Sequence, residues 1–241
     1  MAKIALVTGA AVRVGRAIAQ SLAEDGFQMA LHHNRSAAPA EDLAREIRHL
    51  GGTAEPFQAD LSDPSAARRL IRAVEARFGP RLDLLVNSAS IYRPSRVDEG
   101  TDDDWEQILA INLRAPFQLV REAATLLRAA KGTVVNIVDL SAFQAWKRFG
   151  IHAVSKASLL KLTQVQARTY APHVRVNAVA PGNVLPPEDD TQEEIEASRQ
   201  RIPLGRIGAP EDVVRAVRYL VDAPYVTGEV MVVDGGRLLD P

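Results

Sequence analysis

The chain has 241 residues, a length that fits one large α/β domain or two small ones. Hydrophobic residues make up 46% and charged residues 24% of the chain, which excludes collagen-like, disordered and coiled-coil proteins. The formal net charge is −1 and cysteine is absent, so we expect no nucleic-acid or anionic-membrane partner, no disulfide and no thiolate metal site. No segment reads as a membrane span or signal peptide, and we expect a soluble, cytoplasmic protein.

Short apolar runs alternate with longer stretches of helical periodicity. Seven strands are predicted, at Ile4–Val7, Gln28–Leu31, Thr53–Gln58, Leu82–Val86, Thr133–Val138, Arg175–Ala178 and Glu229–Val233. Helices are predicted between them, at about 14–25, 38–50, 63–78, 102–129, 152–169 and 210–221. Strands rich in Val, Ile and Leu without alternation are typical of parallel strands covered on both faces. We predict an α/β fold over residues 1–241: a single-domain, doubly wound (Rossmann) parallel sheet of about seven strands with helices on both faces.

One irregular region, at about 183–209, follows the sixth strand and the Pro181-Gly182 pair. Within it, Thr191 and Glu194 have the spacing of a capping box, which predicts a short acidic helix. A long insertion after a strand of a doubly wound sheet is expected to act as a lid over a substrate.

The first strand runs into a glycine-containing loop, Thr8-Gly9-Ala10-Ala11-Val12-Arg13-Val14-Gly15, and then into a helix. Glycine allows the tight turn that brings backbone N–H groups close to a pyrophosphate at a helix N-terminus. We therefore expect dinucleotide binding by the loop residues Gly9, Arg13, Val14 and Gly15. The alternative is a tight strand-to-helix turn without a ligand.

The end of the second strand indicates which dinucleotide binds. NAD-binding folds place Asp or Glu there to hold the ribose 2′-OH, but no acidic residue occurs between Gln28 and Ala40. Asn34, Arg35 and Ser36 stand there instead, and a guanidinium beside a hydroxyl suits a 2′-phosphate. Arg13 of the glycine loop could reach the same phosphate. These residues predict NADPH as the cofactor, and the alternative is a solvated basic turn.

Further motifs follow in a fixed order along the chain. They are Asp60-Leu61, Asn87-Ser88-Ala89-Ser90, Asn112 in the long helix, Lys156, Pro181-Gly182 and Val233-Asp234-Gly235-Gly236. Together with the glycine loop, this series resembles the short-chain dehydrogenase/reductase family over essentially the whole chain. Arg13 departs from the family pattern, since a glycine usually stands there.

The resemblance implies roles for these residues. Asp60 and Leu61 would contact the adenine, and Lys156 would bind the nicotinamide ribose and act in catalysis. Asn112 would be the family's catalytic asparagine. Further cofactor contacts are implied for Asn87, Ser88, Ala89, Pro181 and Gly182. The family also implies a homotetramer built on the long helix at 102–129 and the helix at 152–169.

Several residues resemble one branch of the family, the pteridine reductases. These are Arg13, the turn His32–Ser36, the aromatic Tyr92 after Ser90-Ile91, and Asp139 where other members carry a catalytic serine. The resemblance implies a pterin or folate substrate that contacts Arg13 and Asp139 and stacks on Tyr92. NADPH would supply the hydride for a C=N bond, and Asp139 would supply a proton. We expect burial to raise the pKa of Asp139.

The family's tyrosine is missing, because His152 stands four residues before Lys156 and 13 residues after Asp139. Three interpretations remain open. His152 donates or relays the proton; His152 only fills space and Asp139 acts alone; or the chain binds NADPH without turnover.

Three functions therefore compete: a pterin or folate reductase, a carbonyl or β-ketoacyl reductase, and a non-catalytic NADP-binding protein. A metal site is not expected, since Asp102, Asp103 and Asp104 follow Thr101 at a predicted helix start.

Overall fold

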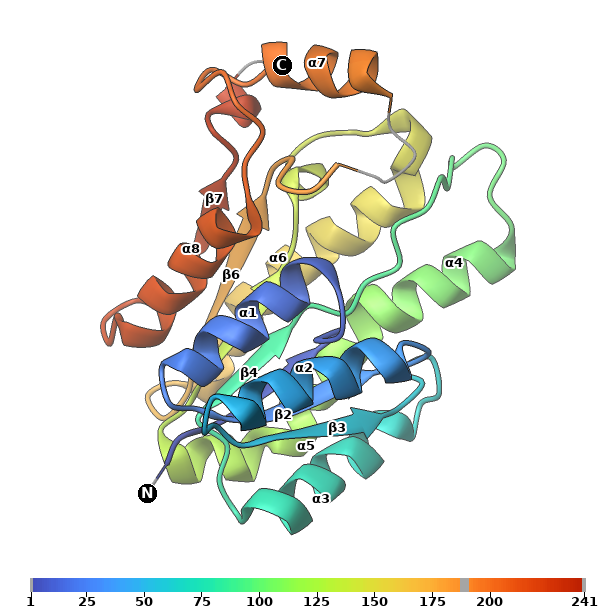
Figure 1. The fold of residues 1–241 in the computed structure, drawn as a ribbon. Helices are drawn as coiled ribbons and strands as arrows, with labels where there is room; N and C mark the ends of the chain where they lie inside the picture. The colour runs from blue at the N-terminus through green and yellow to red at the C-terminus, as the bar shows by residue number, and fades with distance from the viewer. Residues whose placement is uncertain (1, 187–190, 240–241) are drawn as a thin grey trace.

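The protein, seen as a computed structural model that describes residues 2–186 and 191–239, is built on one seven-stranded parallel sheet (Figure 1). The strand order is β3-β2-β1-β4-β5-β6-β7. The strands are β1 Ile4–Thr8, β2 Gln28–His33, β3 Ala54–Gln58, β4 Leu84–Asn87, β5 Thr133–Ile137, β6 Arg175–Pro181 and β7 Val230–Val233. The predicted fold is confirmed. The strand order reverses between β1 and β4, and doubly wound sheets bind ligands at the carboxyl ends of the strands at this point.

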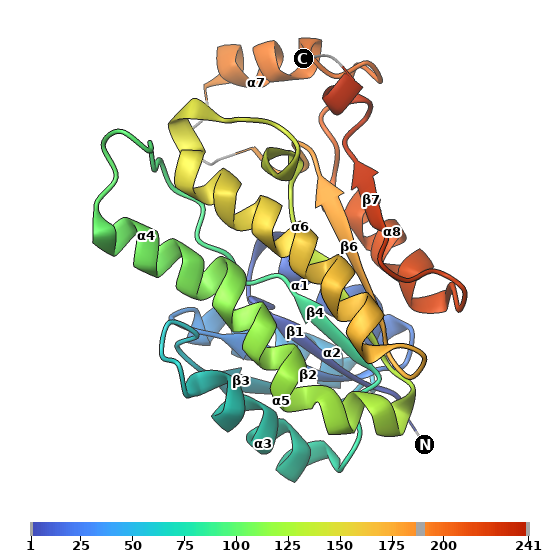
Figure 2. The same ribbon diagram turned by 180° about the vertical axis from the view of Figure 1, so that it is seen from behind.

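Helices cover both faces of the sheet. One face carries α1 Arg13–Glu24, α2 Ala37–His49 and α8 Pro210–Asp222. The opposite face carries α3 Ala66–Phe78, α5 Ala115–Ala130 and α6 Gly150–Tyr170 (Figure 2). Successive residues of β1 alternate between the two layers: Ala5 and Val7 pack under α1, whereas Ile4 and Leu6 pack under α3 and α5. All four side chains are buried, which explains the absence of polar alternation in the strand.

The long helix predicted at 102–129 is interrupted in the structure. It consists of α4 Asp102–Leu109, a π-helical turn η1 Ala110–Arg114, and α5. The N–H of Ala115 bonds to the carbonyl of Ala110, five residues back. Pro116 has no N–H for the carbonyl of Asn112 four residues back, and its ring disfavours a regular α-turn there. The wide turn therefore falls on Asn112, one of the predicted site residues.

The segment before α6 is more structured than the sequence predicts. Two 3₁₀ turns, η2 Leu140–Ala142 and η3 Lys147–Phe149, lie between β5 and α6. As a result α6 begins at Gly150, which places His152 in its first turn. A further 3₁₀ turn, η4 Arg237–Leu239, follows β7.

The capping box at Thr191 and Glu194 is confirmed, and it opens α7 Gln192–Gln200. This helix lies beyond the carboxyl ends of β6 and β7 (Figure 1). Residues 187–190 of the expected lid lie outside the described residues, and its action as a lid stays a prediction. Within the described part of the chain, no helix is both long and apolar enough to cross a membrane.

Candidate active site

The glycine loop joins β1 to α1 in the tight turn that the sequence predicts. Gly9 has a φ of +66°, which favours glycine, and a Cβ on it would lie 3.0 Å from the Cα of Ala89. A Cβ on Gly15 would lie 2.2 Å from the carbonyl oxygen of Gly9, so only glycine allows α1 to start this close to the loop. The first turn of α1 has no side-chain cap and no acidic residue. Its N–H groups therefore fit an anionic group such as a pyrophosphate.

His32 holds this loop in place, a role that the sequence analysis missed. Its Nδ1 accepts from the N–H of Gly9 at 3.2 Å, and its Nε2–H donates to the carbonyl of Ala59 at 3.1 Å. Burial lowers the pKa of His32 to about 4, so the ring stays neutral and keeps Nδ1 as an acceptor. A histidine at the end of an apolar strand, next to a glycine loop, was the available signal.

The end of β2 presents a basic, unpaired surface. Arg35 forms no hydrogen bond or ion pair within the described residues, and Ser36 begins α2 without capping it through its side chain. The neighbouring Asp60 accepts from the N–H and hydroxyl of Ser62, which lowers the pKa of its carboxyl group, and the charge of Arg35 adds to this. Arg35 and Ser36 are therefore available to a phosphate. Leu61 is buried in the core, and its contact with the adenine stays a prediction.

Asn34 lies in the same turn, where its carbonyl accepts from Gln58 at 3.4 Å. Arg13 of the glycine loop contacts the segment that follows β6. Its backbone is left-handed, with a φ of 53°, and its guanidinium donates to the carbonyl of Leu185 at 2.7 Å. Arg13 thus bridges the glycine loop and the segment after β6. Its contact with a 2′-phosphate stays a prediction, as does that of Val14 with a pyrophosphate.

The end of β4 is fixed to its neighbours by side chains. The hydroxyl of Thr8 accepts from the N–H groups of Ser88 and Ala89, at 3.0 and 3.1 Å. Asn87 donates to Asn136 at 2.7 Å, while its own Oδ1 is buried without a partner among the described residues. That orphaned acceptor fits a ligand hydroxyl at the strand end, the side on which the resemblance places a cofactor.

At the end of β6, Gly182 makes the close approach that its type allows. Its N–H donates to the carbonyl of Val233, and a Cβ on it would lie 2.8 Å from the Cα of Asp234. The Pro181-Gly182 pair therefore fixes the start of the segment that reaches Leu185. A cofactor contact by this pair stays a prediction.

Asp139 and His152 form a direct pair, a contact that the sequence analysis did not predict. His152 Nε2 lies 2.7 Å from Asp139 Oδ2, while His152 Nδ1 lies 3.0 Å from the carbonyl oxygen of Ile91. A carbonyl oxygen only accepts, so Nδ1 carries a hydrogen. A second proton must therefore lie between Nε2 and Oδ2, either on the imidazole or on the carboxyl group. The side chain of Asp139 is 21% exposed and that of His152 only 1%, so Asp139 is the member that a substrate can touch.

The pKa expectation for Asp139 was wrong. Burial does raise the pKa of this carboxyl group, but the hydrogen bond from His152 and the charge of Lys156 outweigh it and hold the pKa below its usual range. The N–H and hydroxyl of Ser141 donate to the same carboxylate, the N–H at 2.9 Å. At neutral pH Asp139 is thus an anion, held between His152 and Ser141.

Lys156 lies beneath the pair. It is buried and donates to the carbonyl of Ile137 at 2.9 Å. Burial lowers the pKa of its ammonium group, which the charge of Asp139 partly offsets. Lys156 and Asp139 therefore stabilise each other's charges at the carboxyl end of β5.

Asn112 uses its whole amide within the protein. Its Oδ1 accepts from the N–H of Ile91 at 2.8 Å and from the hydroxyl of Ser90 at 3.1 Å. Its Nδ2 donates to the carbonyl of Ile91 and to the hydroxyl of Ser155, both at 3.1 Å. An asparagine amide has two donor and two acceptor positions, and all four are filled. Ile91 takes part through its main-chain atoms, which are the same in every residue type, so the sequence analysis missed its role.

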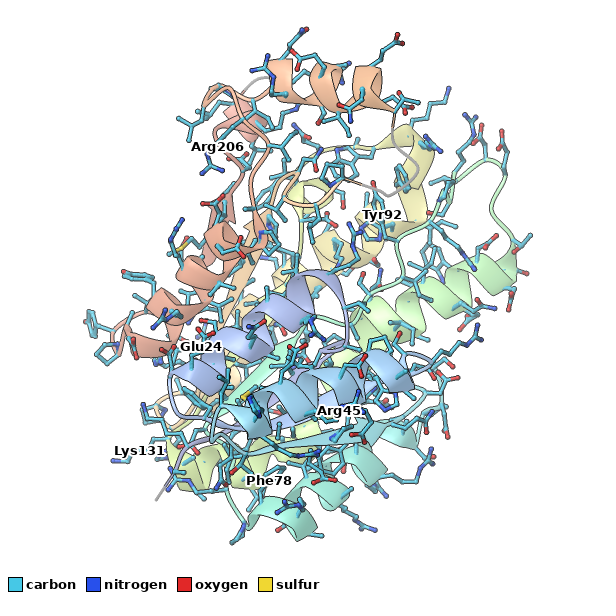
Figure 3. The ribbon with its side chains drawn as sticks, in the orientation of Figure 1. Glu24, Arg45, Phe78, Tyr92, Lys131 and Arg206 are labelled. Carbon is cyan, nitrogen blue, oxygen red and sulfur yellow. The ribbon has the colours of Figure 1, made fainter. Side chains whose placement is uncertain are left out.

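Tyr92 lies in the segment between β4 and α4 (Figure 3), beside the ring of His152. Its ring stacks on Phe149 with centroids 4.5 Å apart and meets the ring of His152 edge-on at 5.0 Å. The residue is 51% exposed. One ring face is thus already covered by Phe149, and stacking on a substrate stays a prediction for the rest of the ring.

The acidic run at Asp102–Asp104 lies in the first turn of α4, where Thr101 and Asp104 form a capping box. Across residues 2–186 and 191–239, no cluster of three His, Asp or Glu side chains is placed to hold a metal ion.

Comparison with known proteins identifies the class. Residues 9–237 match the family model described as "Enoyl-(Acyl carrier protein) reductase". The chain is 33% identical to a 3-oxoacyl-[acyl-carrier-protein] reductase, FabG, of Staphylococcus aureus, over 99% of both chains. It is 34% identical to 3beta-hydroxysteroid dehydrogenase 1 of Eggerthella lenta, over 99% of this chain and 95% of the relative.

Among solved structures, a blue fluorescent protein from a metagenomic library, in complex with NADPH, superposes with a TM-score of 0.91. The two chains are 32% identical, and the match covers 98% of this chain and 97% of the other. Sheet, glycine loop and sequence thus agree on one class, the oxidoreductases built on this fold. The chain belongs to the short-chain dehydrogenase/reductase family, as the motifs predicted.

Proposed function

We propose that this protein is an NADPH-dependent reductase of a carbonyl group, of the kind that 3-oxoacyl reductases act on. The observation that supports a reductase is the Asp139–His152 pair, which shares a proton and of which only Asp139 is exposed. The choice of a carbonyl group as substrate is based on the relatives, which are named for 3-oxoacyl and hydroxysteroid compounds. The pair replaces the serine and tyrosine hydroxyls that usually serve this family.

NADPH fits the residues that the chain offers. The uncapped first turn of α1 and the orphaned Asn87 Oδ1 suit its phosphates and hydroxyls, and Arg35 with Ser36 suits its 2′-phosphate. The NADPH-bound structural neighbour supports the same choice. Lys156 would hold the nicotinamide ribose, as the family resemblance implies. When bound, NADPH supplies the hydride.

The protein's own task is then to move one proton. Because Asp139 is the exposed member of the pair, the substrate would meet Asp139 rather than His152, and the proton would pass from Nε2 through Oδ2 to the substrate oxygen on which negative charge develops. Lys156 stabilises the carboxylate that remains. The pair regains its proton from solvent through the exposed side of Asp139. His152 is therefore a proton reservoir that the substrate does not touch.

A second candidate substrate is a dihydropterin or dihydrofolate, reduced at a C=N bond. The observation that favours it is the anionic Asp139, since a carboxylate accepts an N–H of a heterocycle, which a ketone lacks. The half-exposed ring of Tyr92 beside His152 offers an edge or face to a flat ligand.

A substrate panel separates these functions. We expect NADPH oxidation with a 3-oxoacyl thioester and, under the second candidate, with dihydrobiopterin or dihydrofolate. A simple ketone without a thioester and a saturated acyl thioester are the controls. If NADPH binds but none of these compounds is reduced, the protein is a non-catalytic NADP-binding protein and the proposal fails.

A homotetramer is also part of the proposal. The outer face of the long helices carries a mainly apolar groove lined by Leu109, Leu113, Phe117 and Leu162, with the charged residues Glu106 and Arg114 also on its wall. Phe117 is 42% exposed there. Exposed apolar patches often mark protein–protein interfaces, so this face supports self-association through these helices.

A further inference from the structure

The carbonyl of Ile91 accepts two hydrogen bonds, from His152 Nδ1 at 3.0 Å and from Asn112 Nδ2 at 3.1 Å. We infer that Asn112 is a positioning residue that acts through Ile91: it fixes the tautomer of His152 with hydrogen on Nδ1 and so keeps a proton between Nε2 and Asp139. This inference rests on the proposed role of the pair in proton transfer. The family's tyrosine has no tautomers, so the role arises with the histidine.

The orientation of the Asn112 amide is forced. Oδ1 faces two donors, the N–H of Ile91 and the hydroxyl of Ser90, and Nδ2 faces the carbonyl of Ile91. A flipped amide would oppose oxygen to oxygen and N–H to N–H at Ile91. Asn112 therefore hydrogen-bonds to both the N–H and the carbonyl of Ile91 and holds this carbonyl against the imidazole. We call these two hydrogen bonds the grip on Ile91.

The grip on Ile91 also determines the nature of the direct contact between the side chains of Asn112 and His152. Their side chains approach to 3.3 Å, Nδ2 to Nδ1. Both nitrogens carry hydrogens that point to the same carbonyl, so this contact is not a hydrogen bond. Asn112 thus acts on His152 only through Ile91.

The tautomer decides when the pair gives up its proton. With Nδ1–H held by Ile91, loss of the shared proton leaves the lone pair of Nε2 facing the carboxylate of Asp139 at 2.7 Å. That arrangement is repulsive, so the pair retains its proton as the pH rises. Without the grip, water replaces the carbonyl and donates to Nδ1. The hydrogen then moves to Nε2–H, which bonds to the carboxylate and stabilises the deprotonated pair.

The groups that face the pair come from separate parts of the fold. Lys156 on α6 acts on Asp139 through its positive charge, and Tyr92 after β4 meets the imidazole edge-on. Ser141 donates to the carboxylate from η2. Lys156 is the charged group that would hold the Asp139 carboxylate in either tautomer, so the choice of tautomer falls to Ile91.

The test uses ¹⁵N-histidine NMR of the full chain without substrate. The chain has five histidines, and the His152 signals are those absent from the His152→Phe spectrum. We expect Nδ1 of wild type to stay protonated at every pH where the protein is folded. In Asn112→Leu the high-pH form becomes the Nε2–H tautomer, and the pH at which the pair loses its proton falls by about one unit, the scale of one lost hydrogen bond to a charged group.

Ser155→Ala is the matched control, because it removes a partner of Asn112 and a bond to the main-chain carbonyl of His152 but leaves the grip on Ile91 intact. It should keep the wild-type tautomer. If Asn112→Leu does not fold, the wild-type spectrum still decides, since an Nε2–H tautomer in wild type at high pH overturns the inference. An unchanged tautomer in a folded Asn112→Leu also overturns it. These readings need no turnover, so they stay distinct from failure of the proposed function.

Discussion

Replacing His32 tests how burial controls the stability of the glycine loop. The free histidine has a pKa of 6.5, whereas that of folded His32 is about 4 because the ring is buried. Between these values the unfolded chain binds a proton that the folded chain does not, so stability falls as the pH falls. Each pKa unit corresponds to about 1.4 kcal/mol, so His32 should remove about 3 kcal/mol of stability between pH 7 and pH 4.

The assay is the free energy of unfolding, from denaturant titrations at several pH values, for wild type and His32→Asn. Asparagine can still accept from the N–H of Gly9 but takes up no proton. The variant should be less stable at pH 7 by about 1–3 kcal/mol, since the carbonyl of Ala59 loses its donor. The gap between the two proteins should close or reverse toward pH 4. His173→Gln, at an exposed position, is the control. Parallel curves from pH 7 to pH 4 would refute the reasoning.

Three further predictions follow from the site and the surface. Arg35→Ala should weaken NADPH binding at least tenfold and leave NADH binding unchanged, measured by fluorescence titration against the exposed control Arg72→Ala; equal losses for both cofactors would contradict it. Tyr92→Ala should raise the KM of the substrate found in the panel while the free energy of unfolding changes by about 1 kcal/mol, the value of one aromatic pair; a large stability loss with unchanged KM would make Tyr92 a packing residue. Phe117→Glu places a charge in the apolar groove and should reduce the molecular mass of the assembly measured by sedimentation equilibrium. A monomeric wild type would contradict the proposed tetramer.

Much of the fold follows from sequence, because buried parallel strands and helices differ in length and periodicity. The π-helical turn was not predicted, although the sequence contains a signal for it: Pro116 stands four residues after Asn112, where it removes one helical hydrogen bond. The spacing of Asp139 and His152 matched the family's serine and tyrosine positions, but their direct contact at 2.7 Å was not predicted.

Other features of the site could not be predicted from residue types. The pKa of Asp139 is the sum of large opposing effects, burial against a hydrogen bond and a charge, whose balance depends on distances. The role of Ile91 lies in its main chain, which is the same for every residue. Arg13 reaches Leu185 across 172 positions of sequence, a contact that only the fold creates.

The central claim is that Asp139 delivers the proton. The measurement is the rate of NADPH oxidation by wild type and Asp139→Asn with the substrate found in the panel, together with the Kd of NADPH for both proteins. Asp103→Asn, in the exposed first turn of α4, is the matched control. We predict that kcat of Asp139→Asn falls by roughly 10²–10⁴ while the Kd of NADPH stays within about threefold, because a side chain positioned for proton transfer contributes on this scale. An Asp139→Asn variant that retains most of the wild-type kcat would contradict the claim.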